Sequence, residues 1–411
     1  MKQLLTMTPR ETALARLLDA VPAGPLDVER CATSEALDRV LAEDIVAPHP
    51  LPPFPRSTVD GYAVRAADTR DAGETRPVHL RLVGELRMGR PPDVTVGEGE
   101  AALIHTGGAL PEGADAVVML EYTQLSSPDE VLVERAVAPG ERVIPVGKDV
   151  KCGDLVLAAG KRLRPQELGG LMALGVTEVS VARRPRVAVI STGDELVPPT
   201  QTPGMNQVRD INTTSVSALL RRHGATPLPQ GIVRDDADAL YAVAAPALAQ
   251  ADALIITAGS SVSERDITIK VIEHLGEPGV LVHGVSVKPG KPTILALCDG
   301  KPVFGLPGNP VSALSTIRLF VSPVLWRLQG GVAPRPGYVK ARLAGDVPGV
   351  KRREFFAPVR LEEREDGLWA VPVFGESNLI FTLVRGDGIV HVPLGVPALK
   401  AGTEVNVELL P

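Results

Sequence analysis

The chain has 411 residues, 44% of them hydrophobic, and a formal net charge of −6, so roughly two to four domains with real cores are expected. The acidic balance and an aromatic fraction of 3% argue against a nucleic-acid surface. Three cysteines without paired spacing are typical of a reduced, cytoplasmic protein with neither disulfides nor a zinc site. No secretory segment and no membrane span is predicted.

Helical spacing dominates residues 8–44. A first helix is predicted after Thr8-Pro9, and a second over residues that include Ala36, Leu37, Val40 and Leu41. Five prolines between positions 48 and 55 forbid helix and indicate a boundary.

Short apolar runs separated by Gly and Pro fill residues 56–150 and predict a small all-β module. Helical character returns at 165–174, which suggests that this segment rejoins the first helices in one body. From 335 to 411 the same alternating, Gly- and Pro-punctuated pattern predicts a second β-barrel or sandwich.

Strands and helices alternate between residues 184 and 330. Strands are predicted at 186–191, 228–233 and 252–257, with helices at 212–223 and 236–250. This order predicts right-handed βαβ units and a parallel sheet with helices on both faces.

The predicted architecture is therefore a multidomain α/β protein with a central doubly wound domain, an inserted β module, an elongated helical body and a C-terminal β-barrel. Its four parts are a discontinuous N-terminal body (1–48 and 151–183), the β module (49–150), the α/β domain (184–331) and the barrel (332–411).

A loop with two lysines lies shortly before a predicted helix start. Lys288 and Lys291 flank Pro289-Gly290, and the helix would begin with Asn309 as N-cap, Pro310 at its first position and Ser312 in its first turn. Free N–H groups at a helix start attract anions, and nearby ammonium groups strengthen that attraction. The pattern therefore favours a site for an oxyanion or phosphate.

Acidic residues follow three successive strands of the α/β domain. Asp194 and Glu195 follow the first strand, Asp235 and Asp236 the second, and Asp266 the third. Each alone is explained by helix capping. Because ligands bind at the carboxyl ends of such strands, the set favours a Mg²⁺ site beside the lysine loop.

The remaining loops are less specific. The segment Thr257-Ala-Gly-Ser-Ser-Val-Ser, with Gly259 and Ser261, is rich in small residues and allows close approach of a phosphate. Turns around Asp60, Thr106 and Asp149 are ordinary hairpin turns when taken alone. The seven scattered histidines predict no metal ligand, and no Ser-His-Asp or Cys-His arrangement supports acyl transfer.

Six motifs in chain order resemble one family. They are Ser57-Thr-Val-Asp60-Gly-Tyr-Ala, Thr106-Gly-Gly-Ala-Leu-Pro-Glu-Gly-Ala-Asp-Ala-Val-Val, Ser191-Thr-Gly-Asp-Glu-Leu, Gly231-Ile-Val-Arg-Asp-Asp, Lys288-Pro-Gly-Lys-Pro and Leu306-Pro-Gly-Asn-Pro-Val-Ser-Ala. The chain resembles the molybdopterin molybdenumtransferases, which include the MoeA proteins and the E domain of gephyrin. The resemblance covers essentially the whole chain.

The resemblance implies a homodimer whose cleft lies between the α/β domain of one subunit and the β module of the other. It implies that adenylylated molybdopterin and molybdate are substrates, and that a Mg²⁺-dependent step cleaves the phosphoanhydride and releases AMP. The implied catalytic residues are Asp60, Asp235, Asp266, Lys288 and Lys291. The implied metal ligands are Asp194, Glu195 and Asp235. The implied substrate-binding residues are Thr106, Asp149, Gly259, Ser261, Pro292, Asn309, Ser312, Arg352 and Ser377.

Three positions depart from the family pattern, namely Ala258, Ser263 and Gly284, and they leave tungstate open as an alternative to molybdate. Two other functions also stay open at this point. One is a molybdopterin adenylyltransferase, and the other is a non-catalytic scaffold or cofactor-binding relative.

Overall fold

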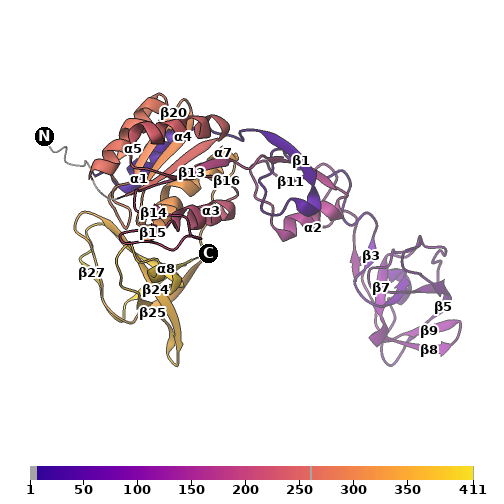
Figure 1. The fold of residues 1–411 in the computed structure, drawn as a ribbon. Coiled ribbons are helices and arrows are strands. Elements are labelled where there is room, and N and C mark those ends of the chain that lie inside the picture. Colours follow the sequence, from indigo (N-terminus) through magenta and orange to yellow (C-terminus); the bar gives the residue numbers. More distant parts are fainter. Residues whose placement is uncertain (1–6, 260–261, 411) are drawn as a thin grey trace. The chain divides into compact units, whose positions relative to one another are not determined.

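The structure is a computed structural model that describes residues 7–259 and 262–410. Contacts divide the chain into two compact units, which are described separately (Figure 1). The first unit comprises Met1–Glu43, Ala159–Pro165 and Glu178–Pro411, and the second comprises Asp44–Ala158 and Gln166–Thr177.

The second unit is built on a six-stranded sheet with the strand order β7-β4-β6-β5-β9-β8. The strands of the whole unit are β2 (Ile45–Val46), β3 (Arg56–Ser57), β4 (Gly61–Val64), β5 (Val78–Glu85), β6 (Glu100–Ile104), β7 (Ala116–Met119), β8 (Thr123–Ser127), β9 (Glu130–Val133), β10 (Val143–Ile144) and β11 (Leu155–Leu157). The four strands outside the six-stranded sheet form the pairs β2–β11 and β3–β10. One core packs Tyr62, Leu80 and Val131 together. The prediction of an all-β module is confirmed, and the helix predicted at 165–174 is α2 (Pro165–Ala173).

The α/β domain of the first unit has a six-stranded sheet in the order β16-β13-β17-β21-β20-β18. The strands of the whole domain are β13 (Arg186–Thr192), β14 (Leu196–Val197), β15 (Val208–Arg209), β16 (Thr226–Val233), β17 (Ala253–Ala258), β18 (Pro278–His283), β20 (Ile294–Cys298) and β21 (Lys301–Pro307). Of these, β14 and β15 pair only with each other. Its helices are α3 (Asn212–Arg222), α4 (Ala237–Gln250), α5 (Val262–Leu275), α6 (Pro310–Thr316) and α7 (Ser322–Leu328), with a π-helical turn (Ile317–Val321) joining the last two.

Alternate side chains of the central strands pack on opposite faces of this sheet. Val187 and Val189 lie in one core with residues of α3, α6 and α7, whereas Ala188 and Ile190 lie in another with residues of α4 and α5. Helices therefore cover both faces, as predicted (Figure 1).

The three predicted strands run parallel, as predicted, but the sheet continues into an antiparallel edge. Strands β16, β13, β17 and β21 run parallel, but β20 is antiparallel to both β21 and β18. The cause is the turn Asp299-Gly300, where both residues have positive φ values of 48° and 80°. Such a two-residue turn joins neighbouring strands as a hairpin.

The prediction of a second N-terminal helix is wrong. After α1 (Arg10–Ala20) the chain forms β1 (Val28–Ala32), which pairs with β12 (Glu178–Ala182), and then a short 3-10 turn (Thr33–Glu35). Asp38 has a φ of 64°, which no right-handed helix contains. The N–H groups of Asp38 and Leu41 donate to the carbonyls of Leu163 and Lys161 at 2.8 and 2.9 Å, so tertiary pairing replaces the helix.

The C-terminal segment forms a closed barrel, as predicted. Its strands are β22 (Tyr338–Leu343), β23 (Val347–Pro348), β24 (Glu354–Arg364), β25 (Gly367–Pro372), β26 (Gly388–Val392), β27 (Ala398–Leu399) and β28 (Glu404–Leu409), with one helix, α8 (Phe381–Val384). The order β24-β25-β22-β28-β26 closes because β26 pairs again with β24. A strand from the α/β segment, β19 (Val287–Lys288), pairs with β24 from outside this ring.

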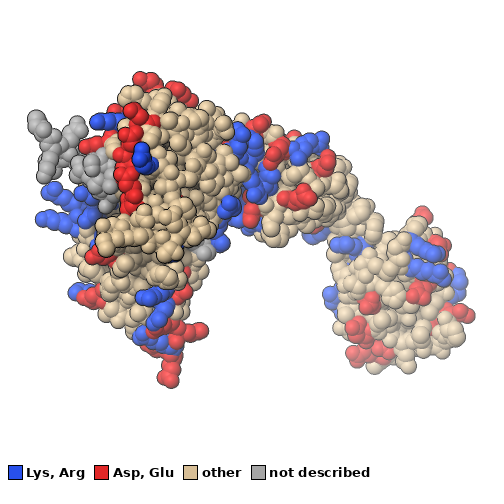
Figure 2. Space-filling view, viewed as in Figure 1, with Lys and Arg blue, Asp and Glu red and all other residues tan. Residues whose placement is uncertain are grey.

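One helix of the described residues, Pro310–Leu328, is long and apolar enough to cross a membrane by composition. However, 72% of its most apolar window is buried inside the protein. Phe320, Val324 and Leu325 are fully buried in a core of the α/β domain. The helix is thus a core element. Figure 2 shows acidic and basic side chains interspersed on the face that it displays.

Candidate functional site

Four parallel strands end side by side at one edge of the α/β sheet. In their spatial order β16, β13, β17 and β21, they are followed in the chain by Asp235, Asp194, Gly259 and Asn309. Ligands of open α/β sheets bind at this edge. The sheet therefore brings the acidic loops, the glycine loop and the helix start to one row, as predicted.

Two of the predicted metal ligands are neighbours. The backbone N–H of Asp235 lies 3.4 Å from Oδ1 of Asp194, so the loops after β16 and β13 touch. The carboxylate of Glu195 folds over Gly193, where an added Cβ would lie 2.8 Å from Glu195 Oε2. Asp194 and Glu195 are exposed and Asp235 is half-buried.

The donor set suits Mg²⁺ with substrate phosphates as additional ligands. No group of three or more His, Cys, Asp or Glu side chains in the described part of the chain is arranged to hold a metal ion. Mg²⁺ is commonly bound by only one or two carboxylates together with phosphate oxygens and water. Asp194 and Asp235 fit that arrangement, and their role stays a prediction. Asp266 lies exposed on α5, and no described contact links it to them.

A network of buried polar side chains stabilises the ligand edge of the sheet behind these loops. The hydroxyl of Ser191 donates to Asp210 Oδ1 at 3.1 Å and lies 3.0 Å from Thr213 Oγ1, and Thr257 Oγ1 lies 3.2 Å from Ser191 Oγ. The N–H of Thr213 also donates to Asp210 at 3.1 Å. Asp210, only 4% exposed, therefore fixes the start of α3 to the end of β13. Sequence reasoning missed it, although an acid just before a predicted helix is a signal.

The glycine loop and the helix loop are in close contact. An added Cβ at Gly308 would lie 2.9 Å from the carbonyl oxygen of Ala258 and 3.3 Å from the Cα of Gly259. Gly259 and Pro292, both predicted site residues, line one cavity of about 10 Å³, close to the space of a single water. Ser261 lies outside the described residues.

The lysine loop packs on helix α6. Gly290 has a φ of 114°, and an added Cβ would lie 2.5 Å from Thr316 Cγ2, so this position requires glycine. Lys288 and Lys291 on either side are both exposed. The loop that carries both lysines thus packs on this helix, and the approach of their ammonium groups to the helix start stays a prediction.

The start of α6 differs in detail from the prediction. Asn309 has the backbone position of an N-cap, but its side chain makes no capping hydrogen bond. Instead Asn309 Nδ2 donates to Ser377 Oγ at 2.9 Å, and the N–H of Val311 donates to the Ser377 carbonyl at 3.1 Å. A barrel loop therefore occupies one of the first N–H groups, while Ser312 is 4% exposed in the first turn.

Arg352 lies on the turn that leads into β24. It is exposed, with a φ of 60°, and two residues later Glu354 pairs with Val287 of the lysine segment. Contacts between the barrel and the α/β domain therefore involve Lys288, Asn309 and Ser377, and Arg352 lies two residues before one of the pairing positions.

Three predicted residues belong to the β module. Asp60 accepts hydrogen bonds from the N–H and the hydroxyl of Thr106 at 2.8 and 3.2 Å, and the backbone N–H is the main cause of a lowered pKa of Asp60. His105, which was not predicted, lies 3.7 Å from Asp60 and 2.9 Å from Glu85. Asp149 is exposed in another loop. The relation of these residues to the α/β domain stays a prediction.

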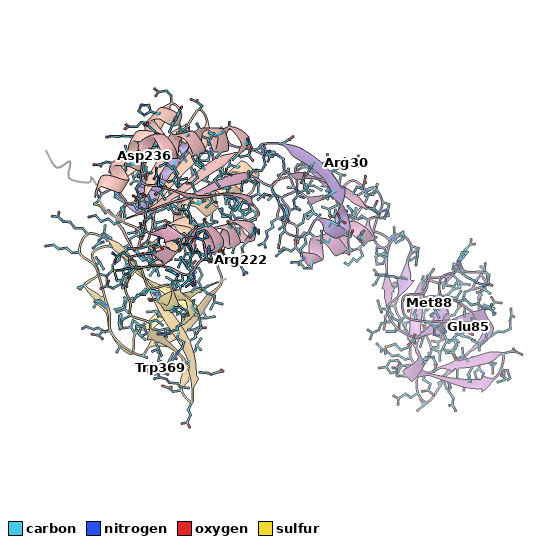
Figure 3. All side chains as sticks on the ribbon, in the orientation of Figure 1. Arg30, Glu85, Met88, Arg222, Asp236 and Trp369 are labelled. Carbon is cyan, nitrogen blue, oxygen red and sulfur yellow. The ribbon has the colours of Figure 1, made fainter. Side chains whose placement is uncertain are left out.

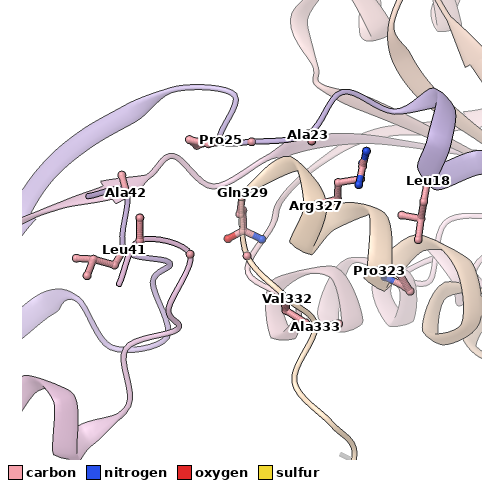
Figure 4. Close-up of a pocket in the computed structure, with 15 residues that line it drawn as sticks. Leu18, Ala23, Pro25, Leu41, Ala42, Pro323, Arg327, Gln329, Val332 and Ala333 are labelled. Carbon is pink, nitrogen blue, oxygen red and sulfur yellow. The ribbon is translucent and has the colours of Figure 1, made fainter. Parts of the chain in front are cut away.

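A cavity of about 520 Å³ lies elsewhere in the first unit, at the end of α7 (Figure 4). Its lining includes Leu18, Leu41 and Val332, and none of the predicted site residues. Its polar side chains are already engaged, because Arg327 Nε and Gln329 Nε2 donate to the carbonyls of Val21 and Leu325 at 2.8 and 2.9 Å. Its chemistry does not match an oxyanion.

A doubly wound domain with an acidic and a basic loop at its ligand edge, joined to a β module and a barrel, is the architecture of a multidomain α/β enzyme. Family models match in the same order: "MoeA N-terminal region (domain I and II)" over residues 8–175, "Probable molybdopterin binding domain" over 188–327 and "MoeA C-terminal region (domain IV)" over 340–410.

Full-length relatives agree with these matches. The chain is 32% identical to the molybdopterin molybdenumtransferase of Bacillus subtilis over 98% of this chain and 94% of the relative. It is 35% identical to that of a Nostoc species over 91% of this chain and 86% of the relative. A molybdopterin biosynthesis MoeA structure from Pyrococcus horikoshii matches with a TM-score of 0.80 and 40% identity, over 98% of this chain and 99% of that one. The chain belongs to the molybdopterin molybdenumtransferase family, the molybdenum-transferring enzymes of molybdenum cofactor biosynthesis.

Proposed function

We propose that this protein inserts molybdenum from molybdate into adenylylated molybdopterin in a Mg²⁺-dependent reaction that releases AMP. The observation that carries the proposal is the convergence at one sheet edge of the Asp194–Asp235 contact and the α6 start with its lysine loop. A dianion and a pyrophosphate are the two charged parts of the substrates, and this edge offers chemistry for both.

In this proposal the loops divide the substrates between them. Asp194 and Asp235, with Glu195 beside them, would hold Mg²⁺, which when bound would neutralise charge on the phosphoanhydride. Lys288, Lys291 and the Asn309–Ser377 pair would hold the tetrahedral oxyanion. Gly259 would let the backbone approach the substrate closely, and Pro292, which lines the same small cavity, would contact the substrate beside it. Ser261, Ser312, Arg352 and Asp266 would complete the binding surface.

The chemistry that these residues supply is positioning and charge stabilisation. An oxygen of water or of molybdate would attack phosphorus as the phosphoanhydride bond breaks, and AMP would leave. The two dithiolene sulfurs would replace oxygen ligands of molybdate, which leave as water with the thiol protons. The ammonium groups of Lys288 and Lys291 would hold the incoming dianion close to the breaking bond. Among the described residues, no carboxylate forms an ion pair with either lysine, so the charge of both is available for the substrate.

We further propose a homodimer in which Asp60, Thr106 and Asp149 of a second copy complete the site. The Thr106 N–H lowers the pKa of the Asp60 carboxyl and so favours its charged form, which suits a group that faces a cation or a donor. Three free cysteines support a reducing, cytoplasmic location. Tungstate is the alternative oxyanion that the assay below compares with molybdate.

The test is AMP release from adenylylated molybdopterin in the presence of Mg²⁺ and molybdate, followed by chromatography. We expect release by the wild type and a loss of at least about a hundredfold in Asp235→Ala and Lys291→Ala. Exposed residues of the same types outside the proposed site, Asp238 in the first turn of α4 and Lys340 on β22, provide the controls Asp238→Ala and Lys340→Ala, which should retain activity.

The same assay separates the alternatives. Wild-type protein that releases no AMP contradicts the proposal and favours a non-catalytic role. Adenylylation of molybdopterin on incubation with Mg-ATP alone would favour an adenylyltransferase instead. Replacing molybdate with tungstate measures which oxyanion the site prefers.

A further inference from the structure

Strand β19 carries Lys288 out of the α/β domain and into the barrel sheet. It pairs in parallel with β24, so that Val287 opposes Glu354 and Lys288 opposes Phe355. The N–H of Glu354 donates to the carbonyl of Ser286 at 2.9 Å. The backbone position of Lys288 is therefore set by the barrel.

The side chain of Lys288 lies over an aromatic ring of that strand. Its Nζ is 4.8 Å from the centroid of the Phe355 ring, within the roughly 6 Å over which a ring face attracts an ammonium group. No described carboxylate forms a salt bridge with Lys288. A carboxylate would neutralise the lysine, whereas a ring holds it and leaves its charge for an anion.

The strand that bears Phe355 is itself held at this point. Phe355 pairs with Val392 of β26 and packs half-buried against the barrel core. The neighbouring Glu354 accepts a hydrogen bond from Arg10 Nε at 3.1 Å and lies 2.8 Å from His391 Nε2. These contacts from α1 and β26 fix the segment that meets Lys288.

The opposite side of the loop is held by helix α6. An added Cβ at Gly290 would lie 2.5 Å from Thr316 Cγ2 and 3.5 Å from Val287 Cγ2. Because the loop backbone is held between strand and helix, most of the freedom left to Lys288 is in its side-chain rotamers. A ring that restricts those rotamers lowers the entropy cost of binding an anion.

We propose that Phe355 is a positioning residue for Lys288 and thereby sets the affinity of the site for its tetrahedral oxyanion. The inference rests on the proposed function, in which Lys288 binds molybdate. Phe355 itself need not touch the substrate. Its effect should therefore appear in the molybdate dependence of the reaction and not in the affinity for adenylylated molybdopterin.

The first test compares Phe355→Leu with Phe355→Tyr in the AMP-release assay at saturating adenylylated molybdopterin and Mg²⁺. Phe355→Leu should raise the KM for molybdate about fivefold at unchanged kcat. Phe355→Tyr keeps the ring and should stay within about twofold of the wild type. The KM for adenylylated molybdopterin should be the same in all three proteins.

A second series keeps the shape of the side chain and so remains informative if Phe355→Leu folds poorly. A monofluorinated and then a trifluorinated phenylalanine in place of Phe355 weaken the negative ring face stepwise while packing is preserved. The KM for molybdate should rise with each step. In a Lys288→Met background the same replacements should change nothing further, because the cation is gone.

A second cation–ring pair in the same barrel supplies the control. The Arg364 guanidinium lies 4.7 Å from the ring of Trp369 on β25 (Figure 3), and Trp369→Leu should leave the KM for molybdate unchanged. A constant KM across the fluorinated series, or equal losses of kcat in Phe355→Leu and Phe355→Tyr, would overturn the positioning role. If the wild type itself releases no AMP, the proposed function fails instead.

Discussion

Asn309 Nδ2 donates a 2.9 Å hydrogen bond to Ser377 Oγ, which joins the start of α6 to a barrel loop 68 residues further along the chain. The backbone repeats the connection, because the N–H of Val311 donates to the Ser377 carbonyl at 3.1 Å. The helix start therefore presents side-chain donors in addition to its remaining N–H groups. An oxyanion bound there would face both domains.

A negative charge at this helix start should oppose oxyanion binding. Asn309→Asp is nearly isosteric and keeps a residue suited to the N-cap position, but it places a carboxylate beside the expected dianion. We expect the KM for molybdate to rise at least about tenfold, with the unfolding midpoint unchanged. Steady-state AMP release measures the first quantity and thermal denaturation the second.

Asn406→Asp introduces the same charge on the exposed face of β28 and should leave the KM for molybdate unaltered. If Asn309→Asp and Asn406→Asp behave alike, the helix start is not the oxyanion site.

The Mg²⁺ requirement should depend on Asp194 and Asp235. Asp194→Asn and Asp235→Asn each remove one charged oxygen donor from the contact between their loops, and Mg²⁺ strongly prefers carboxylate oxygen. The Mg²⁺ concentration for half-maximal AMP release should therefore rise at least about tenfold in each variant. Titration with MgCl₂ at fixed ionic strength measures it.

Asp238→Asn, on the first turn of α4 beyond the capping residue Asp236 (Figure 3), serves as the control and should titrate like the wild type. An unchanged Mg²⁺ requirement in both Asp194→Asn and Asp235→Asn would place the metal on other residues.

Burial of His223 should make the protein less stable below neutral pH. Desolvation is the main cause that lowers the pKa of His223 to about 4, from an ordinary 6.5. Between about pH 6.5 and 4, His223 is therefore protonated in the unfolded chain but stays neutral in the folded chain. Stability present above pH 6.5 is lost as the pH falls through this window, by on the order of 2 kcal/mol.

His223→Asn should remove that pH dependence while its amide can still reach Ser322, whose Oγ lies 3.0 Å from His223 Nδ1. Urea midpoints of the wild type and variant at pH 7 and pH 4.5 give the comparison, with the exposed His49→Asn as reference. An equally steep pH dependence in His223→Asn would assign the effect to other groups.

A methyl group at Gly290 should disrupt the lysine loop. Gly290→Ala combines a φ of 114° with a Cβ only 2.5 Å from Thr316 Cγ2, and we expect a loss on the order of 3 kcal/mol together with a raised KM for molybdate. Gly300→Ala has a positive φ of 80° but no neighbour within 4 Å. It should lose only about 1 kcal/mol and leave the KM unchanged.

Adding Thr316→Ser to Gly290→Ala removes the clashing methyl and should recover part of the stability, since only the backbone strain remains. If Gly290→Ala and Gly300→Ala are equally stable, the loop does not pack on α6 as described.

Much of the fold could be read from local pattern. The buried strands that became β13 and β17, and the helix start at Pro310, each carry their signal within a few residues. The apolar spacing at residues 36–41 led to the wrong prediction of a helix, because Val40 and Leu41 are buried by pairing with residues more than a hundred positions away. The hairpin at Asp299-Gly300 carried a local signal that was overlooked.

The candidate site was partly predictable for the same reason. Residues that directly follow strands, such as Asp194 and Asn309, are placed by the sheet, so their shared edge followed from topology. Partners from remote segments were not predictable from spacing. Phe355 reaches Lys288, and Asp210 reaches Ser191, only through the folded arrangement of separate elements.

The pairing of β19 with β24 has a consequence for any exchange of the last domain of this chain. If recombination replaced only the segment after residue 331, the Val287–Lys288 strand would have to pair with a β24 of different sequence. The incoming domain would have to preserve the register and the ring opposite the lysine. The last domain of this chain therefore depends on a dipeptide that lies outside its own sequence.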